Sequence, residues 1–166
     1  MNTSLMLRAG LMLGAVRTVW IAVEHLVGAR STHLEWIEPS YGLFLFVGAP
    51  LTWFLLLRDH KRGLNTQPLS IKEILTVGLG AGLLSGFINV GVFACYTEVL
   101  NPNYLGAFIA WNAENSSNTF EIANREFRLP AFLDILLVHP TITNPLLAWV
   151  ASRILQISNR SSAQRN

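Results

Sequence analysis

Residues 74–100, ILTVGLGAGLLSGFINVGVFACYTEVL, decide the fold of this chain. The stretch is apolar enough and long enough to cross the roughly 30 Å hydrocarbon core of a bilayer as one helix. Gly78, Gly82 and Gly86 recur at every fourth position, so they share one helical face. Small residues at this spacing let two backbones approach closely in lipid. The pattern therefore predicts a packing seam, with an internal helix rather than a second copy as the expected partner.

The composition also favours a membrane protein. Only 13% of the residues are charged, against roughly 25% in soluble domains, and the mean hydropathy is +0.39. The formal net charge is +2. With so few charges, we interpret the basic excess as a determinant of membrane topology rather than as a nucleic-acid-binding surface. No nucleic-acid partner is predicted.

The remaining apolar segments complete a predicted all-α, integral membrane four-helix bundle. Pro140 and Pro145 predict that its last helix is broken or kinked, because proline removes a backbone donor and clashes with the preceding turn. Ser70 and Glu73 have the spacing of a capping box at the start of the third helix. The prediction is a single transmembrane domain at 1–157, with spans near 9–28, 39–57, 74–100 and 131–157, followed by a polar cytoplasmic tail at 158–166.

Charge predicts the orientation. The 58–73 loop is the most basic in the chain, and the positive-inside rule assigns it to the cytoplasm. Four spans then put both termini in the cytoplasm, and we expect a multi-pass protein of a bacterial inner membrane. An arrangement with three spans would place Arg160 and Arg165 outside, which is the main reason for counting the last segment as a span.

Charged residues inside the first span give a candidate intramembrane polar cluster. Arg17 and Glu24 lie seven positions apart on one face, about 10.5 Å along a helix axis, too far for a direct pair unless the side chains reach. Depth counting puts Glu24 level with Asn89 and Tyr41, with Arg17 one layer below. Three interpretations stay open: a proton or ion relay or polar ligand site, a structural lock that fixes helix register, or a tilted span that lets water reach Arg17.

The sequence offers little for catalysis or metal binding. The histidines show no HxxxH or HxH spacing, and no nucleotide-binding, zinc-protease or serine-hydrolase motif is present. Cys95 is the single cysteine, which rules out an intrachain disulfide, and we expect it to be a small buried apolar residue. We predict no catalytic residue, no cofactor and no metal site.

Several short patterns resemble a family of small bacterial membrane proteins catalogued as domain of unknown function 4199. They are Gly10 and Gly14 in the first span, LRDHKRG at 57–63, LSIKEI at 69–74 leading into Gly78, and NPNY at 101–104. The resemblance covers roughly residues 9–105. It implies four spans with an amphipathic external stretch before the last one, and it implies no catalytic residue, substrate or cofactor.

The leading functional hypothesis is a non-catalytic scaffold or accessory subunit in the membrane. The alternative is a small oligomeric transporter or channel that uses Arg17, Glu24 and Asn89, because four short helices barely enclose a pathway on their own. A membrane enzyme has the least support. The predicted partners are the lipid bilayer and either further copies of this chain or another membrane protein.

Overall fold

The computed structural model describes residues 2–64, 69–115, 122, 124 and 129–163. Every element assigned within these residues is helical, which confirms the predicted all-α class. The elements in chain order are α1 (Thr3–Leu26), η1 (Leu34–Trp36), α2 (Ile37–Leu43), η2 (Phe44–Gly48), α3 (Ala49–Leu64), α4 (Ile71–Cys95), η3 (Tyr96–Leu100), α5 (Tyr104–Asn115) and α7 (Leu129–Ala163).

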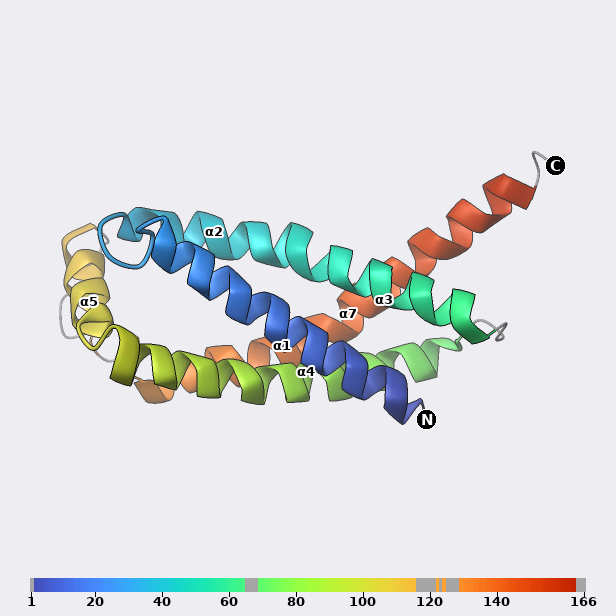
Figure 1. Ribbon diagram of the computed structural model, residues 1–166, viewed down its shortest axis with the longest axis horizontal. Helices are drawn as coiled ribbons and strands as arrows, with labels where there is room; N and C mark the ends of the chain where they lie inside the picture. The colour runs from blue at the N-terminus through green and yellow to red at the C-terminus, as the bar shows by residue number, and fades with distance from the viewer. Residues whose placement is uncertain (1, 65–68, 116–121, 123, 125–128, 164–166) are drawn as a thin grey trace.

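The long helices form a bundle in which α4 is central. α4 packs against both α1 and α7, and α3 packs against the same two helices. Figure 1 shows the start of α1, the end of α3, the start of α4 and the end of α7 at one end of the bundle, with α5 lying across the opposite end. The predicted capping box at the start of α4 is confirmed, because Ser70 Oγ accepts from the Glu73 N–H while the Glu73 carboxylate accepts from the Ser70 N–H.

Within the described residues, three helical stretches are long and apolar enough to cross a membrane. They are Thr3–Leu26, Leu34–Arg62 and Ile71–Leu100, which correspond to the first three predicted spans. The fourth predicted span lies in α7, which is not among them, so the count of four spans stays a prediction.

The last helix runs without interruption through both of its prolines. Pro140 and Pro145 lie inside α7, so no break is seen in this described stretch, while the kink stays a prediction. Side chains bond carbonyls of the preceding turns: Asn144 Nδ2 donates to the Pro140 carbonyl at 2.8 Å, and Thr141 Oγ1 donates to the Leu137 carbonyl at 2.7 Å. The carbonyls that lose their helical donor to the two prolines are those of Leu136 and Thr141, so these side-chain bonds add to the helix beside the prolines and do not replace the missing bonds.

A widened turn precedes the proline of the second span. The Ala49 N–H bonds the Phe44 carbonyl five residues earlier, so η2 is one turn of π-helix between α2 and α3. Pro50 follows directly and has no N–H to donate to the carbonyl four residues before it. The π-turn therefore lies directly before the proline of the second span.

The three predicted seam glycines lie against the backbone of α7. A Cβ atom added to Gly82 would be 2.5 Å from the Pro140 carbonyl oxygen, and one added to Gly78 would be 2.6 Å from Pro145 Cα. At Gly86 the nearest atom would be Leu137 Cδ1, at 3.1 Å. No side chain fits at Gly78 or Gly82 without moving backbone, so the close approach of α4 and α7 requires glycine at both positions.

The outer surface of the bundle is rich in apolar side chains, in addition to the buried apolar core. Large apolar side chains face outward, for example Phe46 at 79% exposure and Phe87 at 62%. Cys95 also lies on the exposed face of α4, with Phe87 and Gly91, so the expectation that it is buried was wrong. Among the described residues, those that are polar or charged and buried are Arg17, Glu24, Arg30, Thr52, Ser85, Asn89, Thr97, Asn112 and Asn144. This distribution is typical of helices surrounded by lipid.

Candidate functional site

The site begins with two charged residues on one face of α1. Arg17 and Glu24 are both buried, at 7% and 3% exposure. Their side chains extend toward each other along the helix, so Arg17 Nη1 lies 3.5 Å from Glu24 Oε1. The two long side chains therefore bridge the axial separation of about 10.5 Å. This is the case that the sequence allowed, in which the side chains reach far enough to pair.

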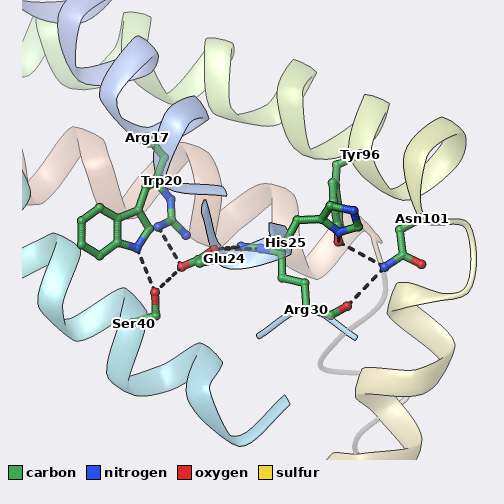
Figure 2. Close-up of polar contacts among 8 residues, drawn as sticks. All are labelled: Arg17, Trp20, Glu24, His25, Arg30, Ser40, Tyr96 and Asn101. Atoms are coloured by element: carbon green, nitrogen blue, oxygen red, sulfur yellow. Dashed lines mark hydrogen bonds and ion pairs between the residues drawn. The ribbon is translucent and has the colours of Figure 1, made fainter. Parts of the chain in front are cut away.

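Glu24 takes its shortest contacts from residues outside α1 (Figure 2). Arg30, in the turn after α1, contacts Glu24 Oε2 through Nη2 at 2.6 Å and through Nε at 2.8 Å. Ser40 Oγ on α2 donates to Glu24 Oε1 at 2.7 Å, and Trp20 Nε1 donates to Ser40 Oγ at 2.9 Å. Both carboxylate oxygens are thus occupied by internal donors. We call Arg17, Trp20, Glu24, Arg30 and Ser40 the Glu24 cluster.

Arg30 is held on its other side by aromatic rings. Its guanidinium carbon lies 5.2 Å from the Tyr104 ring centroid, 5.3 Å from that of Tyr96 and 6.0 Å from that of Phe93. The Nη1 atom is buried without a hydrogen-bond partner among the described residues. Aromatic faces attract a desolvated guanidinium, so these rings partly compensate that atom. Because Tyr104 opens α5, Arg30 also ties α5 to the end of α4.

The turn that carries Arg30 depends on glycine. Gly28 has a φ of +79°, and a Cβ there would be 2.6 Å from Thr32 Oγ1. The end of α1 and the turn after it are both anchored to η3 and to the segment that follows η3. His25 Nδ1 of α1 lies 3.1 Å from the Tyr96 hydroxyl, and Asn101 Nδ2 donates to that hydroxyl and to the Arg30 carbonyl. Figure 2 shows these bonds beside the Glu24 cluster. The turn is folded back so that Arg30 points into the bundle.

A small cavity adjoins the Glu24 cluster on the Arg17 side. It has a volume of about 50 Å³ and lies between α1, the α2–η2–α3 rod, α4 and α7. Tyr41 and Asn89 both line it, together with Arg17. The Arg17 guanidinium carbon lies 5.2 Å from the Tyr41 ring centroid and 4.9 Å from that of Phe44.

The four residues of the predicted polar cluster therefore lie in two adjoining places. Among the described residues, Glu24 accepts hydrogen bonds from Arg17, Arg30 and Ser40. Tyr41 instead pairs its hydroxyl with His139 Nδ1 of α7 at 2.9 Å. Asn89 is 7% exposed, and its Oδ1 has no hydrogen-bond partner within the described part of the chain. Arg17 is the residue common to both places.

Sequence reasoning missed four contributors: Arg30, Ser40, Trp20 and His139. Arg30 lies in the polar link after the first span, and His139 directly precedes Pro140, so neither position indicates a place in this site. Ser40 is the neighbour of Tyr41, and it is this neighbour that faces Glu24. The position of Ser40 next to Tyr41, which depth counting places level with Glu24, is the one sequence feature that could have indicated its role.

Comparisons with protein-family models, with curated proteins and with solved structures found no match. Among the described residues, no group of three or more histidine, cysteine, aspartate or glutamate side chains is arranged to hold a metal ion. What the site offers chemically is one carboxylate between two guanidinium groups. Burying such charges in lipid costs several kcal/mol per ion unless they pair.

Proposed function

We propose that this chain is a small integral protein of the bacterial inner membrane that serves as a non-catalytic scaffold or accessory subunit. The observation that carries the proposal is the complete internal occupation of Glu24: Arg30, Ser40 and Arg17 take both carboxylate oxygens. A carboxylate that relays protons or binds a solute needs a free oxygen in at least one state. Here the charges join α1, the following turn and α2, as expected of a lock on helix register.

A small oligomeric transporter or channel is the second candidate, and the cavity beside Arg17 and Asn89 favours it. Its volume of about 50 Å³ is well below the roughly 300–1,000 Å³ of typical small-molecule sites. A solute pathway through one copy would require the helices to separate. We therefore rank transport below the scaffold.

The proposed topology has four spans and both termini in the cytoplasm. The ends of α1, α3, α4 and α7 that would face the cytoplasm share one end of the bundle (Figure 1), in agreement with the positive-inside assignment of the 58–73 loop. A reporter fused after Asn166 tests it, and an external reporter would contradict four spans. Membership of the family catalogued as domain of unknown function 4199 is part of the same proposal and rests on the sequence patterns given above.

Flux measurements separate the scaffold from the transporter. The purified full chain is reconstituted into vesicles, and proton, potassium and chloride fluxes are compared with those of protein-free vesicles. A scaffold gives no flux above that background. A flux that is present in the wild-type chain and lost in a folded Arg17→Lys variant would overturn the scaffold in favour of the transporter.

Cross-linking inside the membrane tests the scaffold directly. A photoreactive residue at the outward-facing Phe46 or Phe87 position is activated in intact membranes. The scaffold predicts a discrete protein adduct from at least one face, whose mass distinguishes a second copy from another membrane protein. Lipid adducts alone from every outward position would contradict it.

A further inference from the structure

The cavity beside Arg17 has room for more than one water molecule. Its volume is about 50 Å³, whereas one water needs roughly 10–15 Å³ in the same measure. Its lining combines apolar side chains with a few polar ones from α1, α2, α4 and α7. A cavity of this size with several polar groups in its mainly apolar lining holds water or a small polar ligand rather than staying empty.

Most polar groups around the cavity are already bonded. Asn144 Oδ1 accepts from Trp53 Nε1 at 2.8 Å, and Ser85 Oγ donates to the Gly82 carbonyl at 3.0 Å. Thr143 Oγ1 donates to the His139 carbonyl at 2.8 Å. Asn89 differs, because it is only 7% exposed and its Oδ1 has no partner among the described residues. An unsatisfied amide at this depth costs free energy unless a ligand binds it.

The charge of the cavity is positive. Arg30 lies 2.6 Å from Glu24, whereas Arg17 reaches the same carboxylate at 3.5 Å. The stronger pair therefore neutralises Glu24 and leaves the Arg17 charge undercompensated. No aspartate or glutamate belongs to the described residues that line the cavity. A cation would be repelled here, and a small anion would be attracted.

We propose that this cavity binds one monovalent anion of halide size, between Arg17, Asn89 and Tyr41. The guanidinium supplies the charge. The Asn89 amide supplies an N–H once it is rotated so that Nδ2 takes the place of the unpartnered Oδ1. The Tyr41 hydroxyl can donate to the anion when His139 is protonated at Nδ1, because that N–H then donates to the hydroxyl oxygen. Lipid headgroups are too large for a volume of about 50 Å³. The site does not depend on the scaffold function, since binding requires no transport.

Thermal unfolding of the full chain in detergent tests the site. Sodium chloride is exchanged for sodium gluconate at constant ionic strength, because gluconate is too large for the cavity. We expect Tm to rise with chloride by about 3–5 °C for each tenfold increase above the dissociation constant. Asn89→Leu fills the cavity and should abolish this slope. Thr97→Val, a buried polar change on η3 away from the cavity, should keep it.

The outcomes are decisive in both directions. A wild-type Tm that is independent of chloride would mean that the cavity holds water only, and it would overturn the proposal. Equal slopes in the wild-type chain and Asn89→Leu would move the anion elsewhere and also overturn it. If Asn89→Leu does not fold, anomalous diffraction from wild-type crystals grown in bromide replaces it. A bromide peak beside Arg17 supports the site, and no peak there contradicts it.

Discussion

The two halves of α4 are held to the bundle by opposite means. From Gly78 to Gly86 the helix meets α7 backbone to backbone, and shape alone makes the contact. Beyond Asn89 it borders a polar layer in which charges and hydrogen bonds from α1, α2 and a turn must all be satisfied. Substitutions in the first half should destabilise the bundle by steric clash, in proportion to the added volume. In the second half, removal of any one polar partner should destabilise it.

The largest effect is expected at Glu24. Glu24→Gln leaves Arg17 and Arg30 buried without a counter-charge, which should lower the free energy of unfolding by about 3–5 kcal/mol. Equilibrium unfolding in mixed micelles measures it. Glu35→Gln is the matched control, because the Glu35 side chain is 52% exposed and should be near neutral. A loss below about 1 kcal/mol for Glu24→Gln would contradict this, because the buried carboxylate would then contribute no more stability than an exposed one.

The glycine half should respond next most strongly. Gly82→Ala adds a Cβ that would meet the Pro140 carbonyl oxygen at 2.5 Å, and overpacking of this kind costs about 1–3 kcal/mol. Gly91→Ala on the same helix has nothing within 4 Å of the new Cβ. It should be neutral or stabilising by up to about 1 kcal/mol, because alanine favours the helix. Equal effects of the two changes would remove the steric seam from the account.

Ser40 tests how far the polar layer depends on single hydrogen bonds. Ser40→Ala removes one donor to Glu24 and leaves Trp20 Nε1 without its acceptor, at a cost of about 1–3 kcal/mol. Tryptophan emission should shift along with the unfolding midpoint. Ser31→Ala is the control, since the Ser31 hydroxyl makes only an exposed 3.4 Å bond. An unchanged midpoint for Ser40→Ala would show that the two arginines suffice.

The smallest effect is expected at the exposed pair between α1 and α3. Arg8 and Asp59 are 2.9 Å apart with side chains 57% and 65% exposed, and exposed pairs contribute about 0–1 kcal/mol. Asp59→Asn should therefore leave the unfolding midpoint nearly unchanged. The small remaining shift should decrease further at high salt, because salt screens exposed charges. A loss comparable to that of Glu24→Gln would contradict the distinction between buried and exposed charge.

Spacing and hydropathy predicted the local features of the fold. The Ser70–Glu73 capping box is a four-residue pattern, and the helical class follows from long apolar runs, so both could be read directly. The glycine period located a seam face on α4, and the structure has α7 against it. Each of these features depends on residues close together in one helix.

The polar layer could not be derived in this way. Depth counting gives the level of a residue but not its direction around the bundle, so Asn89 and Tyr41 were grouped with Glu24 rather than with the cavity. Arg30 enters the layer because the turn at Gly28 folds back with a φ of +79°. Glycine at position 28 permits this turn but does not require it. Only the packed structure shows that the turn places Arg30 beside Glu24.

The central claim is that Glu24 and Arg30 form a structural lock, and a double-mutant cycle tests it most directly. Unfolding free energies are measured for the wild-type chain, Arg30→Gln, Glu24→Gln and the double variant. The account predicts a coupling of about 1–3 kcal/mol, with the double variant losing clearly less stability than the sum of the single changes. Additivity within about 0.5 kcal/mol would show that the two residues act independently and would contradict the lock.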